Sequence, residues 1–236
     1  MFGANPFYRV LEDNLRGRDF FVGDLHGHYD LLIRTLDAIG FNRAEDRLIS
    51  VGDLVDRGPD SPACIELLAQ PWFEACLGNH EWMLLAGTLR RDRTAREMQL
   101  GNGGHWIEGV PEARLRQWCE IISKRCPLAI EVKLGSRRIG VTHNDVPDND
   151  WRRLRKKASE KLTDRCLWSR QRFMKALDHP EAVPPVRGID LVVSGHNPHH
   201  EPVWAGNQIY IDTLWKSERL TVISAEDLFI RLACRP

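Results

Sequence analysis

The sequence predicts an α/β fold with parallel strands, organised as one domain over residues 1–236. Three times in the first third of the chain, a strand-length apolar run, a glycine-flanked polar motif and an amphipathic segment follow one another. Strand, motif and helix in succession imply βαβ units, whose motifs gather beyond the carboxyl ends of the strands. The single domain is predicted because the chain has no low-complexity linker and no composition shift that would mark a boundary.

The first unit begins with a strand at 20–22. It continues into the motif Gly-Asp-Leu-His-Gly at 23–27, which carries Asp24 and His26. Apolar residues at helical spacing then predict a helix over 29–39.

The second unit repeats this order. Its strand at 48–51 leads into the motif Gly-Asp-Leu-Val-Asp-Arg-Gly at 52–58, and a helix is predicted over 60–68 with Pro62 in its first turn. The motif carries three polar candidates: Asp53, Asp56 and Arg57.

The third unit has a strand at 73–77, the motif Gly-Asn-His-Glu at 78–81 with Asn79 and His80, and a short apolar helix over 81–89. Carboxylates, an amide oxygen and imidazoles are the mixed donor set that holds divalent first-row metals. A plain loop explains one Gly-Asp turn, but three ligand-rich turns in order favour a metal site, with glycine allowing close approach of the backbone.

The second half of the chain adds two strand-end histidines. His143 follows a strand at 138–142, and His196 follows an apolar run at 189–193. A hydrogen-bonded structural role explains either histidine alone, but together at strand ends they favour the shell of a second metal. Other expected elements are polar helices over 90–125 interrupted at 101–104, a strand at 128–132, one or two charged helices over 148–177, and short strands with turns from 202 onward.

The amino-acid composition limits the classes of partner that we expect. Lys plus Arg and Asp plus Glu both number 33, so the net charge is zero and gives no electrostatic case for nucleic acid or an anionic membrane. The six cysteines lack Cys-x-x-Cys spacing, so we expect reduced thiols in core positions. No apolar run approaches the roughly 20 residues of a membrane span, and no secretory signal is seen. We therefore expect a cytoplasmic protein, with a monomer favoured.

The ordered motifs resemble the phosphoprotein phosphatase family, in particular the small bacterial and lambda-type serine/threonine phosphatases among the calcineurin-like metallophosphoesterases. The resemblance runs from about residue 20 to 213 and includes Ser-Gly-His-Asn-Pro at 194–198. It implies a central β-sandwich flanked by helices, with the βαβ units carrying two divalent metals. Manganese is the first expectation, with iron or zinc as alternatives. The implied partners are phosphorylated protein substrates.

The resemblance also implies a metal shell with one bridging residue. Asp24 and His26 would bind the first metal, and Asp53 would bridge both. The second metal would be completed by Asn79, His143 and His196.

Catalytic roles follow from the same resemblance. A hydroxide bridging the metals would attack phosphorus, His80 would protonate the leaving oxygen, and Asp56 would orient the His80 ring. The substrate phosphate would be bound by Arg57, Arg170 and Asn79.

Some positions depart from the family pattern. Asn144 and Asn197 stand where Ala and Thr are usual, and Leu214-Trp215 stands where a small Gly-Ala-like pair is common. Because every predicted ligand is intact, these departures concern the shape of the substrate cleft. Asp145 has two possible roles, to add a negative charge near the second metal or to cap the next loop. We favour the loop cap.

The predicted reaction is metal-dependent hydrolysis of phosphoserine and phosphothreonine in proteins, with phosphotyrosine as a further candidate. The nearest alternative is a diadenosine-tetraphosphate hydrolase, a relative whose second motif usually lacks the aspartate equivalent to Asp56. A catalytically silent scaffold that binds phosphoproteins is the alternative from another class, disfavoured by the intact ligands and His80. The basic run at 152–157 is explained as a solvated helix face, favoured, or as a dock for acidic substrates.

Overall fold

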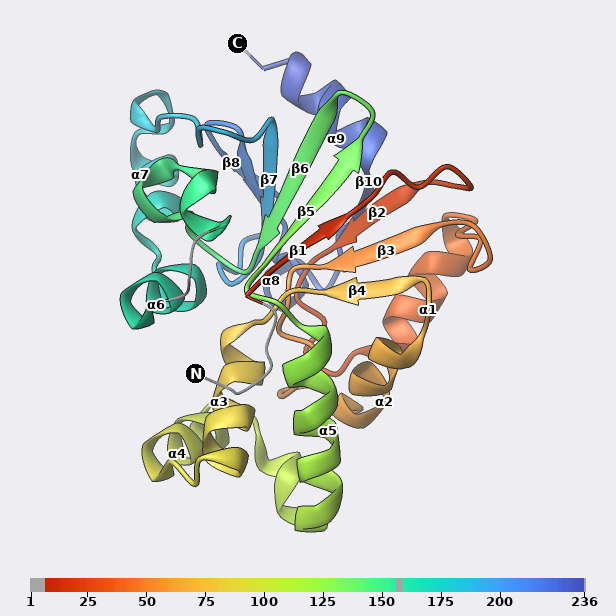
Figure 1. The fold of residues 1–236 in the computed structure, drawn as a ribbon, viewed down its shortest axis with the longest axis vertical. Helices are drawn as coiled ribbons and strands as arrows, with labels where there is room; N and C mark the ends of the chain where they lie inside the picture. The colour runs from red at the N-terminus through yellow and green to blue at the C-terminus, as the bar shows by residue number, and fades with distance from the viewer. Residues whose placement is uncertain (1–6, 156–158, 236) are drawn as a thin grey trace.

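Two β-sheets lie face to face in the computed structural model, which describes residues 7–155 and 159–235 (Figure 1). The core between the sheets takes Phe21 and Ile49 from one sheet and Ile130, Val141 and Val193 from the other, all of them fully buried. Each such side chain contributes roughly 1.5–3 kcal/mol on burial. The sandwich implied by the family resemblance is therefore confirmed.

The smaller sheet contains the three predicted βαβ strands. Its order is β10 (Val222–Ser224), β2 (Asp19–Val22), β3 (Arg47–Ser50) and β4 (Phe73–Ala75), with β2, β3 and β4 parallel and β10 antiparallel to β2. Parallel strands end at the same edge, so the three motifs that follow β2, β3 and β4 leave the sheet side by side.

Helices cover the outer face of this sheet, as the βαβ prediction requires. They are α1 (Tyr29–Ala38), α2 (Ser61–Glu66), α3 (Asn79–Leu89) and α5 (Glu112–Arg125). Their apolar residues form one buried cluster with strand residues such as Phe20, Leu48 and Phe73. Strand neighbours Phe20 and Phe21 thus face opposite layers, which is the period-2 alternation of a sheet buried on both faces.

The larger sheet has six strands. In spatial order they are β1 (Tyr8–Leu11), β5 (Ala129–Leu134), β6 (Arg137–Thr142), β7 (Leu191–Ser194), β9 (Gln208–Tyr210) and β8 (Val203–Ala205). All were expected except β1, which lies parallel to β5 with Tyr8 opposite Ala129. A four-residue strand whose partner is more than a hundred residues away has no local signal of its own.

Five further helices complete the described part of the fold: α4 (Arg93–Gly101), α6 (Glu160–Trp168), α7 (Gln171–Asp178), α8 (Leu214–Ser217) and α9 (Ala225–Ala233). Of these, α4 packs against α3 and α7 against β8 (Figure 1). The sequence predicted the regions of α4, α6 and α7 but only strands and turns where α8 and α9 form. Ser224 is the N-cap of α9, and its side chain accepts a hydrogen bond from the Asp227 N–H at 3.0 Å, which is a local helix-start signal.

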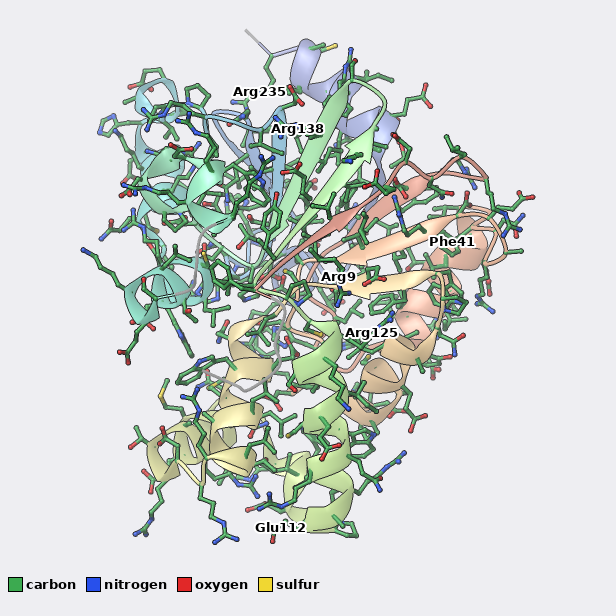
Figure 2. All side chains as sticks on the ribbon, viewed as in Figure 1. Arg9, Phe41, Glu112, Arg125, Arg138 and Arg235 are labelled. Atoms are coloured by element: carbon green, nitrogen blue, oxygen red, sulfur yellow. The ribbon has the colours of Figure 1, made fainter. Side chains whose placement is uncertain are left out.

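Ion pairs on the surface connect the two sheets. Arg9 of β1 lies 2.5 Å from Glu74 of β4, and Arg125 at the end of α5 lies 3.6 Å from the same carboxylate (Figure 2). Glu74 is half-buried between the two arginines, so this cluster ties the first strand of the larger sheet to the last strand of the smaller one.

The structure tests two expectations from composition, the buried cysteines and the lack of a membrane-spanning helix. Five of the six cysteines are buried free thiols, but Cys234 is exposed at the end of α9, so the expectation of core positions is wrong for that residue. Within the described ranges, no helix has the length and apolar character required to cross a membrane. Of the basic run at 152–157, residues 156 and 157 lie outside the described residues.

Candidate metal centre and active site

The motifs that follow the strands converge on one small cavity of about 150 Å³. Two further predicted residues, Asp56 and His143, are fully buried behind its wall. The cavity is lined by Asp24, His26, Asp53, Arg57, Asn79, His80, Asn102, Trp168, Arg170, His196, Pro198 and Asp212. The structure therefore brings together every residue that the sequence proposed.

The backbone at this site is strained. Positive φ angles, which non-glycine residues rarely adopt, occur at His26 (42°), Asp53 (51°), Asp56 (71°), Arg57 (71°) and His196 (66°). Such conformations cost of order 1–3 kcal/mol each and persist where surrounding structure enforces them, most often at functional sites.

Gly78 explains how Asp53 comes close to the start of α3. A Cβ atom at residue 78 would lie 2.2 Å from Asp53 Oδ1, which no side chain tolerates. With glycine there, Asp53 Oδ1 accepts a hydrogen bond from the backbone N–H of His80 at 3.0 Å, at the positive end of the helix. The second and third motifs are thereby packed directly against each other.

Asp53 lies between two groups of potential ligands. On one side His26 Nε2 is 3.7 Å from Asp53 Oδ2, and on the other His143 Nε2 is 3.4 Å from Asp53 Oδ1. Asn79 Oδ1 lies 2.9 Å from both His143 Nε2 and His196 Nδ1. The central position of Asp53 is the arrangement expected of a bridging ligand.

Two of the histidines are oriented by backbone carbonyls. His26 Nδ1 lies 3.0 Å from the Val55 carbonyl oxygen, and His143 Nδ1 lies 2.8 Å from the Val51 carbonyl oxygen. A proton on Nδ1 then leaves the Nε2 lone pair directed into the site, as in many metal-binding histidines.

The electrostatics of the site fit a bound cation. Burial lowers the pKa of His26 to about 3 and that of His196 to about 2, so both imidazoles stay neutral and keep a lone pair. Burial would also lower the pKa of His143. The negative charge of the nearby Asp53 carboxylate outweighs burial and raises this pKa to about 10, so the site favours a positive charge at this position. Burial raises the pKa of Asp212 to about 6, and its Oδ1 has no hydrogen-bond partner among the described residues. Neutral imidazoles and buried carboxylates with free oxygens are a donor set for divalent metals.

His80 and Asp56 form a fully buried pair. Asp56 Oδ2 lies 2.7 Å from His80 Nδ1, while the other oxygen, Oδ1, accepts hydrogen bonds from Trp106 Nε1 at 2.7 Å and Gln99 Nε2 at 3.2 Å. Trp106 and Gln99 were not predicted, because nothing in their local sequence marks them as partners of a residue some fifty positions earlier.

The two predicted phosphate-binding arginines approach the cavity from different elements. Arg57 follows β3, and its guanidinium lies 2.8 Å from His26 Nε2 and 3.2 Å from His80 Nε2. Arg170 comes from the larger sheet's side, where it directly precedes α7 and lines the cavity. Two planar guanidinium groups at one cavity can together hold a tetrahedral oxyanion.

Glu81 has a structural role that the sequence analysis did not assign. Its buried carboxylate accepts hydrogen bonds from four backbone N–H groups, those of Asp53, Leu54, Val55 and Gly78. Burial raises the pKa of Glu81 to about 7, while these four donors favour the ionised form. Its position three residues after Gly78, typical of a capping box, is the signal that could have revealed it.

The departures from the family pattern contact each other. Asn197 Nδ2 donates to Asn144 Oδ1 at 2.9 Å, which links the loops that follow His143 and His196. Asp145 is not the local loop cap that we favoured: it is fully buried and accepts hydrogen bonds from Ser169 Oγ at 2.6 Å and the Arg172 N–H at 3.2 Å. It therefore fixes the segment on both sides of Arg170.

Comparison with known proteins agrees with this geometry. The family model described as calcineurin-like phosphoesterase matches residues 20–223. The chain is 34% identical over 208 residues to serine/threonine-protein phosphatase 2 of Salmonella typhimurium, covering 87% of this chain and 91% of that protein.

Two further relatives carry a different name. A symmetrical bis(5'-nucleosyl)-tetraphosphatase of Legionella pneumophila is 40% identical over 104 residues, covering 38% of this chain and 37% of that protein. A crystal structure provisionally assigned as a diadenosine tetraphosphatase superposes with a TM-score of 0.64 at 22% identity, covering 95% of both chains. At that identity the structural likeness supports the fold alone.

Proposed function

The chain belongs to the calcineurin-like phosphoesterase family, and on that premise we propose that it is a metal-dependent phosphatase of phosphoserine and phosphothreonine in proteins. The observation that carries the proposal is the buried His80–Asp56 pair at 2.7 Å, beside the Arg57 guanidinium. A leaving alkoxide needs a proton, and this pair is built to supply one. The 34% identity to a serine/threonine-protein phosphatase over most of both chains supports the same substrate class.

The proposed metal site holds two divalent ions, with manganese first. Asp24 and His26 would hold one ion, Asp53 would be shared, and the second ion would be held by Asn79, His143 and His196. Bound divalent metals supply an acidified water and neutralise phosphate charge.

The protein's own residues supply the rest of the reaction. Arg57 and Arg170 bind the phosphate oxygens, helped by the Asn79 side chain, and offset the charge that develops on them. His80 would pass a proton from Nε2 to the leaving oxygen, while Asp56 at Nδ1 keeps the ring in one orientation.

Hydrolysis of dinucleoside polyphosphates is the second candidate. It is favoured by the 40% identity to a symmetrical bis(5'-nucleosyl)-tetraphosphatase over 104 residues. Against it, Asp56 is present and held by three hydrogen bonds, whereas the tetraphosphatase group usually lacks this aspartate.

The test is a substrate panel with added manganese. It comprises a phosphoserine peptide, the same peptide with phosphotyrosine, diadenosine tetraphosphate and bis(p-nitrophenyl) phosphate. We expect the kcat/KM of the phosphoserine peptide to exceed that of diadenosine tetraphosphate by about tenfold or more. A chelator should abolish all turnover, and manganese should restore it. Faster cleavage of the tetraphosphate would select the second candidate, and silence throughout would favour a phosphoprotein-binding scaffold.

A further inference from the structure

An exposed tryptophan stands beside the proposed phosphate-binding arginine. Trp215, the second residue of α8, is 60% exposed, and the Arg57 guanidinium carbon lies 5.3 Å from the centre of its ring. The other exposed large apolar side chains among the described residues are aliphatic or methionine. Arginine–aromatic contacts also occur elsewhere among the described residues, but this one joins a solvent-facing indole to an arginine that lines the cavity.

We propose that Trp215 and Arg57 form a subsite for a planar aromatic group attached to the substrate close to the phosphate. This inference rests on the proposed phosphoesterase activity. The aromatic group is either the ring of phosphotyrosine or the base of a nucleotide, since both present a flat π surface within a few bonds of phosphorus.

The size of the cavity requires such a group to lie outside. Pockets that enclose a small organic molecule have volumes of about 300 to 1,000 Å³. This cavity has a volume of about 150 Å³, which is half of the smallest of these values. It accommodates a phosphate and its metals, so the rest of the substrate lies over the mouth. Arg57 lines the cavity and is exposed to solvent, and the Trp215 ring lies against its guanidinium group.

The backbone turn that carries Trp215 is held by the residues around it. Asp212, three residues earlier, lines the cavity, and the neighbouring Leu214 is buried. Thr213 Oγ1 donates to the Arg219 carbonyl oxygen at 2.8 Å, and the Ser217 hydroxyl donates to the Thr213 carbonyl oxygen at 2.9 Å. A ring held by a closed turn loses little entropy when a ligand stacks on it.

The test compares substrates in Trp215→Ala and Trp215→Phe. For two peptides of the same sequence, Trp215→Ala should lower the ratio of kcat/KM for phosphotyrosine over phosphoserine about tenfold, or ~1.4 kcal/mol, mainly through KM. Trp215→Phe should retain most of the ratio because a ring remains. Ile230→Ala on α9, 54% exposed, is the control and should leave every substrate unchanged. Equal losses on all substrates would mean that Trp215 acts only through Arg57 and would overturn the subsite.

Diadenosine tetraphosphate distinguishes the two sources of the aromatic group. A loss for phosphotyrosine alone assigns the subsite to aryl phosphates, and a loss for the tetraphosphate alone assigns it to nucleobases. A loss for neither overturns the proposal.

A binding measurement tests the aromatic subsite without relying on hydrolysis, so failure of the subsite can be told apart from failure of the proposed function. Calorimetry on the manganese-loaded protein compares phenylphosphonate with methylphosphonate. Even if no phosphoserine peptide is hydrolysed, a phenyl preference that Trp215→Ala removes would support the subsite. The same phenyl preference in wild type and variant would refute it.

Discussion

Three side chains hold the Asp56 carboxylate, which is fully buried. One oxygen faces His80, and the other receives the indole N–H of Trp106 and the amide of Gln99. Hydrogen bonds to an ionised carboxylate are roughly twice as strong as neutral ones. Trp106 and Gln99 therefore fix the position of the Asp56 carboxylate, and the carboxylate in turn fixes the orientation of the His80 ring.

Trp106→Phe tests this support. The variant keeps a ring but loses the N–H, so kcat for a phosphoserine peptide should fall about tenfold, with KM within about twofold. Steady-state kinetics with a metal-content assay measure the effect. Trp118→Phe is a matched control, because Trp118 lies 5.9 Å away in the same cluster and its N–H has no hydrogen-bond partner among the described residues. Equal falls in both variants would indicate a packing defect instead of a positioning role.

His80→Asn tests the proton donor. For a phosphoserine peptide we expect kcat to fall about 10²–10⁴-fold. For p-nitrophenyl phosphate the fall should be much smaller, because nitrophenolate leaves without protonation. His105→Asn, at an exposed position, serves as the control. A fall of the same size on both substrates would argue against the acid role, provided that bound metal is retained.

At the scale of elements, one segment supports the second motif at two neighbouring residues, Asp56 and Arg57. Gln99 lies on α4 and Trp106 on the 3-10 helix His105–Gly109, and between them the Gly103 carbonyl oxygen accepts the Arg57 N–H at 3.0 Å. Asn102 lines the cavity. The glycine-rich turn therefore packs against the arginine's own backbone.

Gly103→Ala should disturb Arg57 specifically. Residue 103 has φ of +92°, and an added Cβ would lie 2.9–3.0 Å from the backbone of Arg57. We expect a loss of about 1–3 kcal/mol in the free energy of unfolding and a severalfold rise in KM. Chemical denaturation and kinetics provide both values.

Gly101→Ala is the matched control. An added Cβ at residue 101 meets nothing within 4 Å, and the residue ends α4. This variant should be neutral or slightly more stable, by up to about 1 kcal/mol. If Gly103→Ala behaved in the same way, the turn would not constrain Arg57.

Whether an element could be predicted from the sequence depends on how far apart in the chain the residues that form it lie. The strands and helices of the three βαβ units were predicted within a few residues, because apolar periodicity and local caps specify them. Three elements were missed, and the short helix α8 is one of them. The β1 strand exists through its pairing with β5, and α9 was overlooked although Ser224 caps it.

At the scale of the whole molecule, Glu131 joins distant parts of the chain. Its buried carboxylate accepts hydrogen bonds from Arg155 Nη2 at 2.7 Å, Trp151 Nε1 at 2.9 Å and the Tyr8 hydroxyl. Burial would raise the pKa of Glu131, but these three donors outweigh it and lower the pKa below its usual value. The N-terminal strand and the 3-10 helix Trp151–Arg155 are thereby fastened to β5.

The pH dependence of stability tests this network. Because the folded pKa of Glu131 lies below the unfolded value near 4.5, its stabilisation is present above that pH and is lost as pH falls through the folded pKa. Glu131→Gln should therefore be less stable than wild type by about 1.5–3 kcal/mol at pH 7, with the difference shrinking below pH ~4. Denaturation series at several pH values measure it. Glu12→Gln, in an exposed pair with Lys133, should change stability by less than about 1 kcal/mol at any pH. A Glu131 difference independent of pH would contradict the argument.

The sequence by itself determined the types of candidate ligand, their order and the strands that carry them, because these depend on residue chemistry and on periodicity within short windows. It identified Asp53, Asp56 and Arg57 in one motif, and the structure brings them together around one cavity, with His143 and His196. Only the tertiary structure decided which residues support them. The support of Asp56 by Trp106 and Gln99, and the contact of Trp215 with Arg57, depend on segments far apart in the chain. Such contacts leave no local pattern, because they arise only when the two sheets and their helices pack together.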